Sequence, residues 1–129
     1  MRAKDWHREE TYKSLIQIGV SALKFVLLAN GGAAVAILAF IGKVYLPGTP
    51  IPNVAPSLVL FLLGIVFGGL AHVTGYATQF TLYNEEDKKK QRVSGRRHQI
   101  WLRASVALVV AAIICFAAGS LCGVYALTE

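Results

Sequence analysis

Three long apolar stretches, residues 25–45, 57–83 and 100–127, constrain the fold of this chain more than any other feature of its sequence. The first carries no charge before Lys43, and as a helix of about 21 residues it would rise about 31 Å, the thickness of a bilayer's hydrocarbon core. A soluble domain of 129 residues that is 55% hydrophobic and 16% charged would lack the polar surface to cover itself. The sequence therefore predicts an all-α, polytopic membrane protein with three transmembrane helices.

The segments between the spans belong to the same single membrane domain, residues 1–129. Residues 1–24 carry apolar and polar side chains at helical spacing, which predicts an amphipathic segment. This segment either lies at the membrane interface or begins the first span early, as one long tilted helix. Residues 46–56 contain all four prolines and are predicted to form an outer loop. Residues 84–99 form a basic loop, and acid–base pairs at its start predict that the second helix continues about two turns beyond its span.

The distribution of Lys and Arg predicts the orientation of the spans. Ten of the thirteen basic residues lie within residues 2–13 of the N-terminal segment or residues 88–97 of the basic loop, and none follows residue 127. By the positive-inside rule, the N-terminus and the basic loop should be cytoplasmic, with the proline loop and the C-terminus outside. The basic loop should then contact anionic headgroups. Because topology accounts for the net charge of +6, we expect no nucleic acid partner.

Small residues recur along the three spans at spacings that favour close helix packing. In the second span they share a stripe with two polar residues, and in the third they recur every four residues from 107 to 123. The partner of these surfaces is either another span of the same chain or a neighbouring subunit. The predicted packing residues are Gly31, Gly32, Gly64, Gly68, Gly75, Ala107, Ala111, Cys115, Gly119 and Gly123.

Four polar residues are predicted to form an intramembrane layer: Asn30, His72, Ser105 and Gln79. In hydrocarbon an unpaired polar group is costly, so we expect these side chains to bond one another, and specifically predict a contact between Asn30 and His72. His72 is the titratable residue deep within a span, and it is either a neutral imidazole bonded to a helix neighbour or part of a proton or ion pathway.

The chain contains no HExxH, CxxC, GxSxG or glycine-rich phosphate-binding motif. We therefore expect a protein that is not an enzyme and that has no cofactor and no metal. Its function is predicted to be helix–helix assembly as a homo-oligomer. Two alternatives are an oligomeric pore or ion channel lined by the stripe at residues 64–79, and an accessory subunit that docks onto a larger membrane complex through the small-residue groove at 107–123.

The segment LLANGGAAVAILAFIG at residues 27–42, with GLAH at 69–72 and YATQ at 76–79, resembles a set of small bacterial inner-membrane proteins. The resemblance covers about half of the chain, through motifs rich in glycine and alanine. It implies a multi-pass protein of the bacterial plasma membrane. It implies no established activity, so no catalytic residue is transferred.

Overall fold

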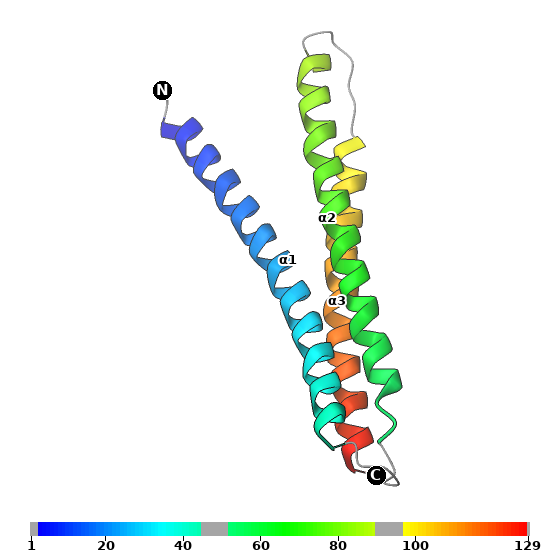
Figure 1. The fold of residues 1–129 in the computed structure, drawn as a ribbon. Coiled ribbons are helices and arrows are strands. Elements are labelled where there is room, and N and C mark those ends of the chain that lie inside the picture. The colour runs from blue at the N-terminus through cyan, green and yellow to red at the C-terminus, as the bar shows by residue number, and fades with distance from the viewer. Residues whose placement is uncertain (1–2, 45–51, 90–96, 129) are drawn as a thin grey trace.

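Three long helices form the described part of the chain (Figure 1). The computed structural model describes residues 3–44, 52–89 and 97–128. The helices are α1 (Ala3–Val44), α2 (Ala55–Lys89) and α3 (Arg97–Thr128). Each contains a segment long and apolar enough to cross a bilayer, namely Glu9–Val44, Ala55–Asn84 and His98–Thr128. The predicted all-α fold with three candidate spans is confirmed, and the protein is a multi-pass membrane protein.

The two predicted loops lie partly outside the described residues. Of the proline-rich segment 46–56, the residues up to 51 are outside, and of the basic segment 84–99, residues 90–96 are outside. Helix α2 extends to Lys89, beyond the end of its apolar segment. This extension is the one that the acid–base pairs at the start of the basic loop predict.

A short turn leads from the proline-rich segment into α2. The Val54 amide donates to the Pro52 carbonyl over 2.9 Å, and the Leu58 amide donates to the Val54 carbonyl over 3.0 Å. Pro56 occupies the first turn of α2, where a missing amide hydrogen removes no helical hydrogen bond. Val54 is buried at this turn and anchors the start of the helix.

Helix α1 is unbroken over its 42 residues and rises about 63 Å, about twice the thickness of the hydrocarbon core. Its C-terminal half packs against α2 and α3, whereas its N-terminal half diverges from both (Figure 1). Every side chain from residue 9 to 21 is exposed. An interfacial helix would have to bend near Lys24 before it entered the membrane. The continuous helix instead matches the alternative of a first span that begins early.

Helices α2 and α3 form an antiparallel pair, the most extensive contact in the molecule (Figure 1). The buried residues of α2 alternate spacings of four and three: Ser57, Phe61, Gly64, Gly68, Ala71 and, after half-buried Gly75, Thr78. A repeat of about 3.5 residues keeps one face of a helix toward its partner, as in left-handed coiled coils. The buried residues of α3 are Ala112, Cys115, Gly119 and Gly123.

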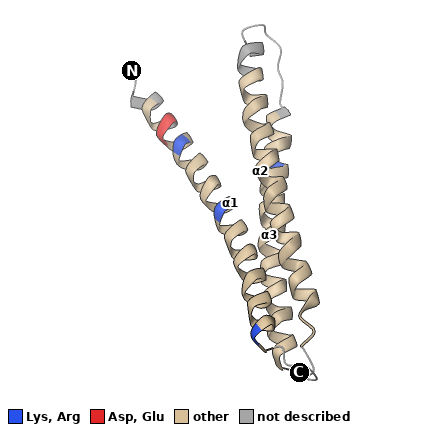
Figure 2. Cartoon of the chain, viewed as in Figure 1, with Lys and Arg blue, Asp and Glu red and all other residues tan. Residues whose placement is uncertain are grey.

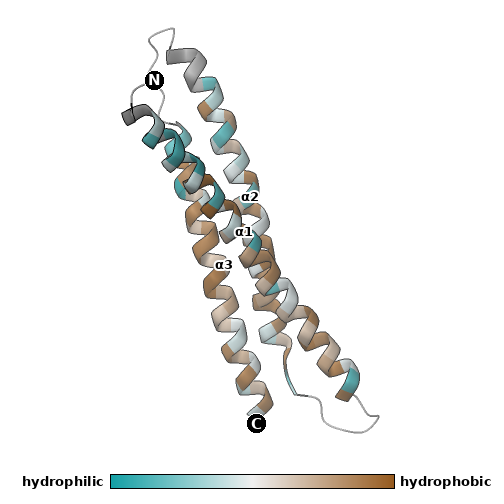
Figure 3. Cartoon of the chain, turned by 90° about the vertical axis from the view of Figure 1, so that its left-hand side faces the viewer, coloured by the Kyte–Doolittle hydropathy of each residue, from teal (hydrophilic) through white to brown (hydrophobic). Residues whose placement is uncertain are grey.

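The interior of the bundle is narrow and made mostly of small side chains, with Phe61 as its one aromatic ring that is almost fully buried in the described chain. Large apolar residues point outward instead, as Leu28 and Leu121 do with 75% and 70% exposure. Figure 3 shows these hydrophobic sides along the helices, and Figure 2 shows that the charges on α1 lie toward its N-terminal part, near its middle and at its C-terminal end, where Lys43 occupies the last turn. Such an outer surface is suited to lipid rather than to water.

Candidate functional site

The three helices meet at a buried polar junction formed by Asn30 of α1, Gly64 of α2 and Ala112 of α3. Asn30 has no exposed surface. Its Nδ2 donates to the Val26 carbonyl of its own helix over 2.9 Å and to the Ala112 carbonyl of α3 over 3.3 Å. One amide group thereby links α1 to α3 inside the apolar bundle.

The other half of this amide rests on a glycine. A Cβ placed on Gly64 would overlap the Oδ1 of Asn30, so a Cα hydrogen of Gly64 points at that oxygen. Among the described side chains, Asn30 Oδ1 is the one buried nitrogen or oxygen atom without a conventional hydrogen bond. A Cα–H···O contact, worth about 0.5–1 kcal/mol, is the interaction that this geometry provides. The absence of a side chain at Gly64 therefore leaves room for the Asn30 amide, and this amide covers the Gly64 backbone.

Two serine hydroxyls make further bonds between helices. Ser57 Oγ of α2 donates to the Gly119 carbonyl of α3 over 2.5 Å, and Ser105 Oγ of α3 donates to the Ala71 carbonyl of α2 over 3.0 Å. Each acceptor is a helix carbonyl, which has a second lone pair beside the one used in the helix. Polar contacts between spans are thus made by short side chains to backbone, spread along the bundle.

The predicted polar layer does not form, and the predicted contact between Asn30 and His72 is wrong. Asn30 bonds Val26 and Ala112, while His72 and Gln79 are exposed on the outside of α2. The physical reason is helix rotation. At about 100° per residue, the eight residues from Gly64 to His72 turn the side chain about 80° away from the face that meets Asn30.

Threonines of α2 are polar groups that the sequence prediction missed. Thr78 is buried and its hydroxyl donates to the Thr74 carbonyl over 2.9 Å, while the Thr81 hydroxyl donates to the Ala77 carbonyl over 2.8 Å. Both bonds are made to the preceding turn of the same helix, a pattern open to any helical threonine. The residue type alone could therefore have predicted these bonds, because a helical threonine hydroxyl can bond its own helix and needs no partner from another span.

Several of the small residues of α2 and α3 lie against side chains of neighbouring helices. A Cβ on Gly68 would lie 2.9 Å from Leu27 Cδ2, and one on Gly119 would lie 2.9 Å from a Phe61 ring carbon. At Gly123 the added atom would lie 3.1 Å from Ser57 Oγ, and Gly75 faces Ser105 more loosely at 3.8 Å. Cys115, which is also buried on α3, is a free thiol.

Other predicted packing positions face outward. Gly32 and Ala107 are exposed, Gly31 and Ala111 are half-buried, and a Cβ on either Gly31 or Gly32 would meet no atom within 4 Å. Steps of four residues rotate about 40° each, so a row from 107 to 123 winds about 160° around α3. Only its end nearer residue 123 can face α2.

These placements cover part of the surface on which each functional alternative depends. Gly64 and Gly68 are covered by Asn30 and Leu27 of the same chain, so the stripe at residues 64–79 does not form a common pore lining. Gly119 and Gly123 lie against Phe61 and Ser57 of α2, so this end of the predicted docking groove is covered within the protomer, while Ala107 and Ala111 at its other end face outward. At Gly119 and Gly123 the groove is therefore packed against another span of the same chain, one of the two possibilities set out above.

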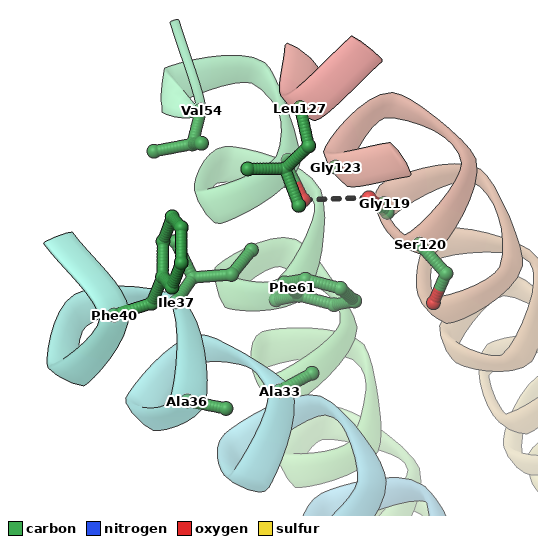
Figure 4. Close-up of a pocket in the computed structure, with 11 residues that line it drawn as sticks. Ala33, Ala36, Ile37, Phe40, Val54, Phe61, Gly119, Ser120, Gly123 and Leu127 are labelled. Atoms are coloured by element: carbon green, nitrogen blue, oxygen red, sulfur yellow. Dashed lines mark hydrogen bonds between the residues drawn. The ribbon is translucent and has the colours of Figure 1, made fainter. Parts of the chain in front are cut away.

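An open apolar pocket of about 310 Å³ lies where α1 ends, α2 begins and α3 ends (Figure 4). Its α1 wall includes Ala33, Ala36 and Phe40, and Phe61 lies across from them on α2. In the described part of the chain, no group of three His, Cys, Asp or Glu side chains could hold a metal ion. Comparison of the chain with protein families, with curated proteins and with solved structures finds no match.

Proposed function

We propose that this three-span membrane protein acts without catalysis, through self-association of α1 into a homo-oligomer. One observation carries the proposal: α1 has a second helix-packing seam on the side away from its own bundle. Its residues alternate spacings of four and three and are all exposed: Leu28, Gly32, Val35, Ala39 and Gly42. This is the same 3.5-residue pattern by which α2 meets its neighbours.

The two glycines of this seam serve no packing role within the protomer. A Cβ on Gly32 or on Gly42 would have no heavy atom within 4 Å. Glycine in a helix costs roughly 0.5–1 kcal/mol relative to alanine, and in lipid its benefit is the close approach of another helix. A second copy of α1 laid along this seam would recover that benefit by van der Waals contact. Leu28 and Val35 would supply side chains that fill the spaces beside the glycines.

We place the oligomer in a bacterial plasma membrane with the N-terminus in the cytoplasm. The sequence resemblance supports the membrane, and the concentration of Lys and Arg in the N-terminal segment and basic loop supports the orientation. In this orientation the divergent N-terminal half of α1 extends toward the cytoplasm. The basic loop lies at the same membrane face and contacts anionic headgroups.

The test is the oligomeric mass of the full chain in lipid nanodiscs or by native mass spectrometry. The wild-type chain should form a defined multimer, and Gly32→Leu should shift it toward monomer because the new side chain separates the two α1 helices. Gly69→Leu is the matched control, since Gly69 is exposed on α2 and also has no atom within 4 Å of an added Cβ. A monomeric wild type, or equal behaviour of the two variants, would overturn the proposal.

A further inference from the structure

The pocket at the end of the bundle is apolar even where serines line it. Ser57 donates its hydroxyl to the Gly119 carbonyl, and Ser120 donates its hydroxyl to the Phe116 carbonyl over 2.8 Å. Neither hydroxyl therefore has a proton to offer to a polar ligand. The remaining walls are alanine, glycine, aliphatic and aromatic side chains. Hydrocarbon is the chemical class that such a lining accepts without the loss of a hydrogen bond.

The size and place of the pocket are suited to part of a lipid tail. Its volume of about 310 Å³ is about twice that of a cavity that holds one benzene molecule, near 150 Å³. Ala33 and Phe40 lie within the apolar span of α1, and the pocket opens between helices rather than being enclosed. An acyl chain from the surrounding leaflet can therefore enter from the side.

A cation stands beside the pocket. Lys43 is exposed in the last turn of α1, one turn beyond Phe40 and about 10 Å along the helix axis from Ala36. Residues seven apart lie on the same helix face, so Lys43 follows the wall that Ala36 forms. The one ion pair among the described residues joins Lys13 to Glu10, so Lys43 has no carboxylate partner there.

We propose that this end of the bundle binds one anionic phospholipid, with an acyl chain in the pocket and its phosphate paired with Lys43. The charge of Lys43 is complementary to the phosphate, and its flexible stem lets the ammonium reach the headgroup level. The site is separate from the α1 seam, whose residues lie on another face of the helix. It is also at the opposite end of the bundle from the end of α2 and the start of α3 (Figure 1).

Native mass spectrometry of the full-length protein can test this site with phosphatidylglycerol and phosphatidylcholine of identical acyl chains. Wild-type protein should retain one phosphatidylglycerol per chain in preference to phosphatidylcholine. Lys43→Gln should lower that preference about fivefold, because one charge pair is lost. Lys24→Gln, an exposed lysine of the same helix outside the pocket, should leave that preference unchanged.

A second pair of variants tests the pocket itself. Ala36→Leu places a larger side chain in the pocket and should lower retention of both lipids roughly tenfold. Ala117→Leu adds the same atoms at an exposed position of α3 outside the lining and should have no effect. Circular dichroism should show equal helicity for all variants. The proposal is overturned if wild type retains no lipid, if each variant matches its control, or if Ala36→Leu changes the multimer mass while lipid retention stays constant, which would assign the pocket to a second copy.

Discussion

Apart from the exposed Gly69 of α2, the described glycines of α2 and α3 lie in an environment opposite to that of the glycines of α1. On α2 and α3, Gly64, Gly68 and Gly119 lie against side chains that a single added carbon would overlap or crowd. On α1, the described glycines 19, 31, 32 and 42 have open space around them. Within the protomer, α1 contributes the inserted side chains Asn30 and Leu27, and α2 contributes the surfaces that receive them. The same residue type thus closes the bundle on two helices and leaves a surface open on the third.

The largest change in the free energy of unfolding should come from the buried junction between Asn30 and Gly64. Gly64→Ala should lower the free energy of unfolding by about 2–3 kcal/mol, because the new Cβ displaces the buried Asn30 amide. In an Asn30→Ala background the same substitution should cost less than about 1 kcal/mol, since the obstructing atoms are gone. Unfolding in SDS, followed by circular dichroism, measures the free energy of unfolding of the wild type, the two single variants and the double variant. Equal costs in the two backgrounds would show that Asn30 is not what Gly64 accommodates.

Intermediate effects are expected from the serines that join α2 to α3. Ser57→Ala and Ser105→Ala should each lower the free energy of unfolding by about 0.6 kcal/mol, the mean for hydrogen bonds between membrane helices. Ser120→Ala is the control, because that hydroxyl bonds the preceding turn of its own helix. The same SDS titration applies. If Ser120→Ala cost as much as the other two, the contribution could not be assigned to contacts between helices.

The smallest effect should come from α1. Gly31→Ala should raise the free energy of unfolding of the monomer by roughly 0.5 kcal/mol, because the added methyl meets no atom and alanine restricts the unfolded chain. The measurement requires a detergent in which the chain is monomeric, so that contacts between copies do not contribute. Gly69→Ala on α2 should behave in the same way. A loss of stability at Gly31 would mean that this side of α1 is packed within the protomer after all.

Several features of the fold could be predicted because each depends on a short stretch of sequence. The three spans follow from runs of apolar residues, and the start of α2 near Pro56 follows from the chemistry of proline. The packing of Gly64 and Gly68 follows from their small size in a helix that must contact others. In each case the residue type itself restricts the possible environments.

The candidate site was predicted only in part, because it depends on how faces of different helices meet. Asn30 was expected to bond a polar partner, yet its partners are the carbonyls of Val26 and Ala112, groups that every residue has. His72 belongs to the same predicted stripe as Gly64, eight residues further along α2, but its side chain faces outward. The pocket beside Phe40 requires the ends of all three helices and has no signature in any one of them.

The sequence by itself determined that three helices cross a bilayer, because the transfer of apolar side chains from water is summed residue by residue and needs no knowledge of the fold. Only the tertiary structure decided which glycines are covered, because a helix turns about 100° per residue, so repeated steps of four drift about 40° each and carry a row of small side chains from one side of the helix to another. It placed Gly64 beneath Asn30 and left Gly32 open. That choice depends on the relative rotation of three helices, a quantity that no single segment contains.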